Sequence, residues 1–188
     1  AVAQTTYDFD YQFAKAPNPP NVSAVTGDGF VTLYWDESAE QSIDKYMGEV
    51  TNGVDLNDFE GYKIYRATDF EFNDAYTITD GDGNLTFLEP YTQNGQKAQW
   101  DLNNGKSGWH PIDLNGVKFY LGDDTGLKHS YRDENVVNGQ RYYYAVVSYD
   151  YGGDLTNEII PSDSPMRLRV NSLTGVIEMG PNVVEVTP

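Results

Sequence analysis

Short runs in which apolar and polar residues alternate recur along this chain, and they constrain its fold more than any other feature. In FVTLYWD (30–36), every second residue from Val31 to Trp35 is apolar. Because successive side chains of a strand point to opposite faces, such a run predicts a strand with one buried face. In the runs at 61–68 and 141–150, the same period of two places Tyr62 with Ile64, and Tyr142 with Tyr144, on one face. Together they predict a structural core that includes Trp35, Tyr62, Ile64, Tyr142 and Tyr144.

Helical periodicity is nearly absent, since residues 38–50 are the only stretch that could hold a helix. The chain has 18 Gly, 9 Pro and 15 Tyr, a composition typical of strands joined by turns. Its 188 residues correspond to one large domain or a domain with arms, because domains commonly run to about 100–200 residues. The sequence therefore predicts an all-β fold, an antiparallel β-sandwich.

The charge balance excludes several classes of partner. Twelve Lys and Arg against 29 Asp and Glu give a net charge of −17. Because phosphate recognition relies on clustered cations, this balance argues against nucleic acid and anionic membrane as partners. No apolar run approaches the ~20 residues of a membrane-spanning helix. With no cysteine, disulfides, thiolate metal sites and cysteine nucleophiles are excluded.

Both ends of the chain carry segments that stand apart from this pattern. Residues 1–16 form an N-terminal arm whose alternating aromatics, Tyr7, Phe9, Tyr11 and Phe13, predict an extra strand for assembly. PNPP at 17–20 then interrupts regular structure, because proline cannot donate to a strand ladder. Residues 171–188 are expected to be a tail or a link to a following domain. The opening Ala-Val-Ala fits the end of a signal-peptidase site, or a point where a fragment was cut.

Several segments together resemble a fibronectin type III domain. They are the proline-bounded first strand, VTLYW with Trp35, FEGYKIYR, NGQRYYYAVVSYD and PSDSP with the strand that follows it. In that family a Trp on strand B packs on a Tyr of strand C, and a tyrosine corner begins strand F; Gly139 and Tyr142 match its spacing. The amino-acid sequences of these segments are most similar to those of fibronectin-like domains in large secreted or surface proteins of Bacteroidota-like bacteria. This resemblance implies a fibronectin type III-like (immunoglobulin-like) sandwich over residues 17–170, export from the cell and a modular parent protein.

Two insertions, at 37–58 and 69–126, enlarge a fold that usually has about 100 residues. The second contains strand candidates of its own, at 75–79, 84–89, 97–102 and 117–121. Long insertions in a compact domain are more often functional than not. We therefore expect the specific function of the chain in these insertions.

Clusters of acidic residues make calcium the one candidate cofactor, because Ca²⁺ takes six to eight oxygen ligands from flexible loops. The candidates are Asp36, Glu37, Glu40 and Asp44 in the first insertion and Asp150 and Asp154 after a strand. The alternative is a solvated acidic surface without a metal. TDGDGN (79–84) is similar to the start of an EF-hand, but Leu85 and Tyr91 stand where that loop requires Gly and Glu. We interpret it as a β-turn.

The aromatic residues of the second insertion are candidates for a binding surface, above all Trp100, Trp109 and Tyr91. Exposed Trp and Tyr rings stack on sugars and anchor protein partners. The alternative is that these rings form a small core of the insertion itself.

No enzyme motif is present, and we expect no catalytic residues. His110 and His129 are the only side chains with an ordinary pKa near neutrality, and both have the sequence context of packed residues. The chain has no GxSxG elbow, HExxH motif, P-loop or dinucleotide fingerprint.

The sequence thus predicts a non-enzymatic structural or adhesive module of an extracellular or cell-surface bacterial protein. Its partners are expected to be neighbouring domains or subunits of a surface assembly, or a glycan, without membrane insertion. One alternative is a subunit of an extracellular filament or surface layer, assembled by strand donation from the arm. Another is a carbohydrate-binding module of a secreted glycosidase that uses Trp100 or Trp109.

Overall fold

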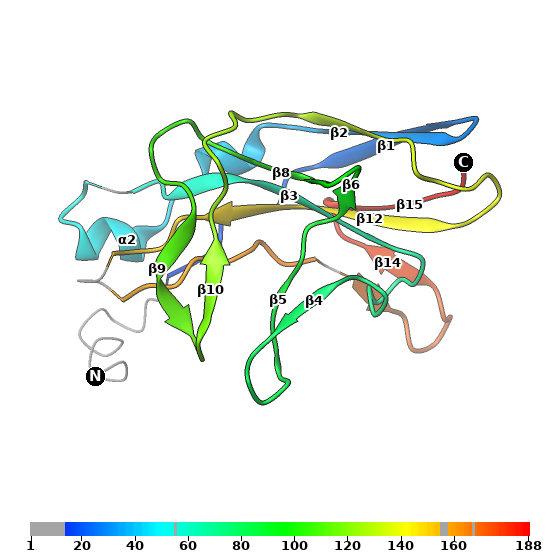
Figure 1. Ribbon diagram of the computed structural model, residues 1–188. Coiled ribbons are helices and arrows are strands. Elements are labelled where there is room, and N and C mark those ends of the chain that lie inside the picture. The colour runs from blue at the N-terminus through cyan, green and yellow to red at the C-terminus, as the bar shows by residue number, and fades with distance from the viewer. Residues whose placement is uncertain (1–13, 55, 155–157, 167) are drawn as a thin grey trace.

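The fold is built almost entirely of antiparallel strands, as the computed structural model in Figure 1 shows. It describes residues 14–54, 56–154, 158–166 and 168–188, so the arm residues Tyr7, Phe9, Tyr11 and Phe13 lie outside the described part. The expectation of an all-β antiparallel fold is confirmed, because every paired strand runs antiparallel to its neighbours. The described residues contain no helix long and apolar enough to cross a membrane.

Two sheets form the centre of the molecule. The first has three strands in the order β1 (Val22–Gly27), β2 (Phe30–Trp35) and β11 (Ser130–Asp133). The second has four strands in the order β15 (Val183–Val186), β12 (Tyr142–Asp150), β3 (Phe59–Ala67) and β8 (Gln99–Asp101).

Four two-stranded hairpins lie outside the two central sheets, and three of them belong to the insertion at 69–126. These three are β4 (Thr77–Thr79) with β5 (Leu85–Leu88), β6 (Thr92–Gln93) with β7 (Gln96–Lys97), and β9 (Trp109–Leu114) with β10 (Val117–Tyr120). The fourth pairs β13 (Leu168–Val170) with β14 (Ile177–Met179). The stretch expected to hold a helix contains the 3₁₀ turn η1 (Ser38–Gln41) and the helix α2 (Lys45–Val50).

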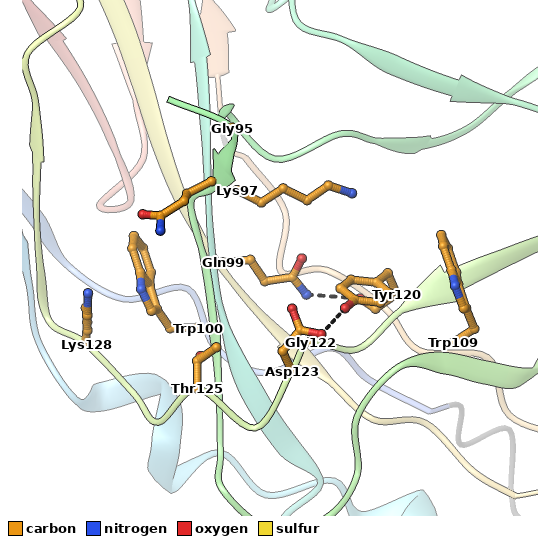
Figure 2. Close-up of a pocket in the computed structure, with 11 residues that line it drawn as sticks. Gly95, Lys97, Gln99, Trp100, Trp109, Tyr120, Gly122, Asp123, Thr125 and Lys128 are labelled. Carbon is orange, nitrogen blue, oxygen red and sulfur yellow. Dashed lines mark hydrogen bonds between the residues drawn. The ribbon is translucent and has the colours of Figure 1, made fainter. Parts of the chain in front are cut away.

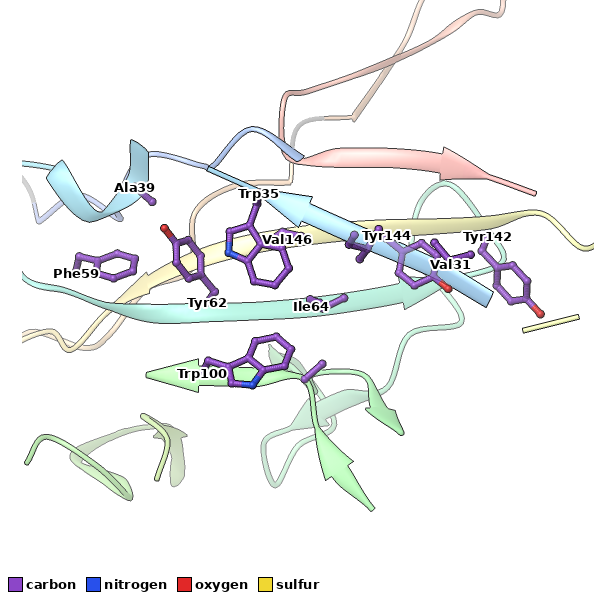
Figure 3. Packing of buried hydrophobic residues seen from close by; sticks show 12 residues of the cluster. Val31, Trp35, Ala39, Phe59, Tyr62, Ile64, Trp100, Tyr142, Tyr144 and Val146 are labelled. Carbon is purple, nitrogen blue, oxygen red and sulfur yellow. The ribbon is translucent and has the colours of Figure 1, made fainter. Parts of the chain in front are cut away.

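The main core lies between the two sheets, where the inward residues of the alternating runs meet (Figure 3). All five predicted core residues belong to this buried cluster: Trp35, Tyr62, Ile64, Tyr142 and Tyr144. The Trp35 ring meets Tyr62 edge-on, with ring centroids 5.8 Å apart. Trp100 completes the cluster from β8, 5.9 Å from Trp35. A strand of the second insertion therefore contributes directly to the main core.

The other face of the four-stranded sheet is also covered. In Figure 1 the hairpins β4–β5 and β9–β10 lie on the side of this sheet opposite to β1 and β2. Beneath them, Tyr65, Tyr143 and Tyr149 are each at most 3% exposed. Phe72 and Phe119 are among the residues that cover them. The long strands β3 and β12 are consequently buried on both faces, which fits the unbroken apolar run of β12 from Tyr142 to Val147.

The C-terminal segment, expected to be a tail or a link to a following domain, contributes a strand to the four-stranded sheet. β15 pairs with β12 from Tyr142↔Val186 to Ala145↔Val183, which makes it an edge strand of the four-stranded sheet. Asn182, next to β15, is fully buried and donates from its side chain to the carbonyl of Val146 at 3.1 Å. This pairing satisfies backbone groups along one side of β12 that would otherwise lack partners.

Candidate functional site: an aromatic cavity at the edge of the four-stranded sheet

Trp100 reaches the site from the edge of the four-stranded sheet. It lies on β8, opposite Tyr62 of β3 in the strand register. Its ring packs against Trp35 and also against Tyr131, whose centroid is 5.5 Å away. Only 7% of Trp100 is exposed. It is therefore first a core residue, and only its outer edge is available to a ligand.

Trp109 reaches the site from the β9–β10 hairpin. A two-residue turn at Asn115 and Gly116 closes this hairpin, with φ angles of 53° and 83°. Two left-handed residues in succession are typical of a type I′ turn, whose twist suits antiparallel strands. The register places Tyr120 opposite Trp109, and their rings pack edge-on at 4.9 Å. Tyr120 thus supports a Trp109 ring that is 60% exposed.

The two tryptophans line one cavity of about 730 Å³, shown in Figure 2. Trp100 stands on one side of it and Trp109 on the other, with Gln99, Tyr120 and Asp123 between them. The structure therefore brings together two of the three residues predicted for a binding surface. Volumes of this order accommodate small ligands, because typical ligand pockets measure about 300–1,000 Å³.

The polar groups between the tryptophans are fixed by hydrogen bonds. The Gln99 amide donates to the carbonyls of Tyr120 at 3.0 Å and Leu121 at 3.1 Å. The hydroxyl of Tyr120 donates to the Asp123 carboxylate. This hydrogen bond, with a smaller contribution from burial, raises the pKa of Tyr120 to about 12, so its hydroxyl keeps its proton at neutral pH. The site thus offers a preorganised carboxylate beside an aromatic face.

A buried aspartate holds the loop that forms one wall of the cavity. Asp101 is fully buried and accepts hydrogen bonds from the backbone N–H groups of Asp124 at 2.6 Å and Thr125 at 2.8 Å. Gly122 begins this loop with φ of 136°, and a Cβ there would lie 2.3 Å from the Asp101 carboxyl carbon. Only glycine permits this close approach. The sequence indicated a turn at 122–126 but carried no sign of its anchor.

Two lysines also line the cavity, and neither was predicted. The ammonium group of Lys97 pairs with Glu89 at 2.6 Å. That of Lys128 lies 5.4 Å from the centroid of the Trp100 ring. They are separated by 31 positions (128 − 97) and lie on different segments, so no local signal could connect them.

Tyr91, the third residue predicted for the binding surface, lies elsewhere. It does not line the cavity; its hydroxyl donates to Asp133 at 3.2 Å, and the Arg66 guanidinium carbon lies 3.9 Å from its ring centroid. This half-buried stack closes the main core beside β11.

Three of the four acids proposed for calcium in the first insertion already accept hydrogen bonds from other groups of the protein. Desolvation alone would raise the pKa of Asp36, but hydrogen bonds from Ser38 and Asn21 outweigh it and lower this pKa to about 2. Asp44 is the N-cap of α2 and accepts from two backbone N–H groups of that helix. Glu40 accepts from the Tyr62 hydroxyl at 3.0 Å and contacts a ring nitrogen of His129 at 2.6 Å. Glu37 precedes η1 and makes no side-chain cap.

The second pair of calcium candidates lies after β12. Asp150 is 3% exposed and accepts hydrogen bonds from Ser162 and from the N–H of Gly152. Burial, assisted by the charge of Asp58, raises the pKa of Asp150 to about 8. Asp154 lines a smaller cavity of about 410 Å³ beside Trp109.

Across the described ranges, no group of three or more Asp, Glu or His side chains is arranged to hold a metal. Calcium binding therefore stays a prediction. If calcium binds the folded state, an excess of chelator lowers the melting temperature of the protein.

Both histidines make structural contacts. His110 is 1% exposed, and its Nε2 lies 2.8 Å from the carbonyl of Gly153. His129 packs 5.7 Å from the Tyr62 ring while it contacts Glu40. These contacts hold both imidazole rings in place. The cavity between Trp100 and Trp109 is thus the arrangement with the clearest chemical use, which is to hold a ligand with a flat apolar face and polar edges.

Comparison with known proteins returns no family model, no curated protein and no solved structure that matches this chain.

Proposed function

We propose that this chain is a non-enzymatic adhesive module of an extracellular or cell-surface bacterial protein, with a fibronectin type III-like sandwich that binds carbohydrate. The strand order supports the fold. If β1, β2, β3, β8, β11, β12 and β15 are strands A, B, C, C′, E, F and G, the two sheets have the orders A-B-E and G-F-C-C′. That arrangement belongs to sandwiches of this architecture.

A hydrogen bond at the start of β12 gives independent support. The backbone N–H of Val137 donates to the hydroxyl of Tyr142 at 3.0 Å. A tyrosine at the start of strand F whose hydroxyl bonds the backbone a few residues upstream is a tyrosine corner. Gly139, with φ of 81°, lies in the turn between these two residues.

One observation carries the binding function: Trp100 and Trp109, on different elements, line the same cavity together with fixed polar groups. Sugars present apolar C–H faces and equatorial hydroxyls, which an exposed indole face and neighbouring polar side chains can bind together. Trp109 supplies the face, since 60% of it is exposed and Tyr120 supports it from behind. The Asp123 carboxylate, held by the Tyr120 hydroxyl, supplies an acceptor for sugar hydroxyls.

The test is the binding of a glycan array by the wild-type chain and by Trp109→Ala, followed by calorimetry on the best ligand. Trp109→Ala should weaken binding at least roughly tenfold, because aromatic hot spots contribute about 2 kcal/mol or more. Tyr76→Ala is the matched control, since Tyr76 is 79% exposed and does not line the cavity. It should bind like wild type. Absence of glycan binding, or equal affinity of Trp109→Ala and wild type, would contradict the proposal.

A further inference from the structure

The cavity continues past Trp100 into a second hollow. This hollow has a volume of about 220 Å³, and it shares Gln96, Lys97, Trp100 and Lys128 with the first. It extends the site as far as Arg132. We call the two adjoining hollows, from Trp109 to Arg132, the groove. Two adjoining hollows suit several linked sugar units better than a single one.

The charge of the groove is opposite to that of the protein. The whole chain has 29 acidic residues and 12 cationic ones. Three cations line the groove, namely Lys97, Lys128 and Arg132, whereas one of its lining residues in the described part of the chain, Asp123, is acidic. A quarter of all cations (3 of 12) therefore gather at one site of a strongly acidic molecule. Glutamates pair with Lys97 and Arg132, so the positive potential of the groove centres on Lys128, and an exposed cation in a cleft attracts anions.

These cations are available to a ligand. Lys128 is exposed, and within the described residues no acidic side chain lies within salt-bridge distance of it. Lys97 and Arg132 pair with Glu89 and Glu134, but both pairs are at the surface, with cation side chains 40% and 50% exposed. Exposed ion pairs contribute only about 0–1 kcal/mol, so a ligand anion can replace the glutamate partner.

We infer that the groove binds an acidic glycan, a polymer whose sugar units carry carboxylates, with a sugar ring on Trp109 and carboxylates beside Lys128 and Lys97. This inference rests on the proposed function and deepens it. A neutral glycan would leave the ammonium group of Lys128 without an anionic partner. A polyanion without sugar rings would leave the exposed face of Trp109 uncovered. Both features of the groove are used only when one ligand supplies a ring and a negative charge.

The experiment compares three uronate polymers, polygalacturonate, alginate and hyaluronan, each with its carboxyl-reduced neutral form. Calorimetry is done on wild type, Lys128→Gln, Trp109→Ala and the control Lys45→Gln, which changes an exposed lysine on α2, outside the groove. At least one polymer should bind wild type roughly tenfold more tightly than its reduced form, since hydrogen bonds to charged groups are the stronger ones. Lys128→Gln should weaken binding of that polymer about fivefold and leave the reduced form unaffected, while Lys45→Gln changes neither.

The outcomes separate this inference from the proposed function. Equal binding of acidic and reduced forms, lost in Trp109→Ala, would overturn the acidic specificity and leave the glycan module standing. Binding of poly-glutamate as tightly as any uronate polymer would overturn the inference, because charge alone would then suffice. It is also overturned if wild type binds none of the three uronate polymers, whatever neutral glycan the array identifies.

Discussion

The Lys63–Asp163 ion pair provides a sharp test of how this β-sandwich is stabilised. The Lys63 side chain is 5% exposed, and its Nζ lies 3.1 Å from Asp163 Oδ1 and 3.6 Å from the centroid of the Phe119 ring. Tyr65 donates its hydroxyl to the other Asp163 oxygen at 2.5 Å. Burial lowers the pKa of Lys63, while Asp163 acts in the opposite direction. Asp163 is thus the main group that stabilises the protonated form of Lys63 beneath the second insertion.

Asp163→Asn keeps the shape of the side chain and removes its charge. Loss of one partner from a buried ion pair costs about 3–5 kcal/mol. Asp163 is 24% exposed and the ring contacts of Lys63 remain, so we expect the lower end, about 3 kcal/mol. For a chain of this size that corresponds to a melting temperature lower by roughly 6–12 °C.

The cost of Asp163→Asn should also depend on pH. Without Asp163 the pKa of Lys63 in the folded state falls further below its ordinary value of 10.5. The unfolded state then binds more protons than the folded state in neutral and alkaline solution, and stability rises with pH. The deficit of the variant should therefore shrink as the pH increases towards that of free lysine.

The assay is urea unfolding followed by tryptophan fluorescence, at neutral pH and near pH 9. Lys63→Met/Asp163→Asn is the control, because replacing both partners of a buried pair is often close to neutral. It should recover to within about 1 kcal/mol of wild type. If Asp163→Asn lies within about 0.5 kcal/mol of wild type, or if the double variant is no more stable than the single one, the reasoning is refuted.

Three further predictions concern the core, the cavity wall and a buried acid. Trp35→Ala should cost about 3–5 kcal/mol in thermal unfolding, because it removes the ring between the two sheets; a loss below about 1 kcal/mol would contradict the packing. Gly122→Ala should lower the free energy of unfolding by about 2–3 kcal/mol, because the new Cβ strains the backbone and contacts Asp101. The control Gly126→Ala, whose Cβ meets open space, should lower it by about 1 kcal/mol. Equal losses in the two variants would refute the close approach of Gly122 to Asp101. Asp150, with its pKa raised from 3.8 to about 8, binds a proton in the folded state that the unfolded state releases, so stability should fall between about pH 4 and pH 8. Asp150→Asn should flatten this decline in urea midpoints measured across that range, and an unchanged slope would show that another group causes it.

Much of the fold could be predicted from local patterns. The alternation in FVTLYWD correctly indicates β2 and its buried face, and the repeated apolar positions of 61–68 and 141–150 indicate β3 and β12. These predictions succeed because the side-chain period of a strand is two wherever it lies in a protein. The turn at Asn115 and Gly116 is likewise a local signal for the β9–β10 hairpin.

The position of β15 and the burial of the outer tyrosines were not available from the same patterns. Val183–Val186 shows an apolar run that fits a strand of this domain as well as of a following one, and only its pairing with β12 decides. Tyr65 and Tyr149 lie on the outer face of their strands, and it is the second insertion that covers them. Which face of a sheet is covered depends on contacts between segments far apart in sequence.

The sequence by itself determined the strands, the residues that face the sandwich core and the excess of acidic charge, because each depends on residue type and spacing alone. Only the tertiary structure decided that Trp100 and Trp109 share a cavity with Lys97 and Lys128. The two rings face the same cavity because β8 adds to the edge of the main sheet while Asp101 holds the loop after β10 against it. This site is assembled from an edge strand, a hairpin and an anchored loop, which come together through loop closure and packing. Contacts of this kind join segments that are far apart in the sequence, so no local periodicity predicts them.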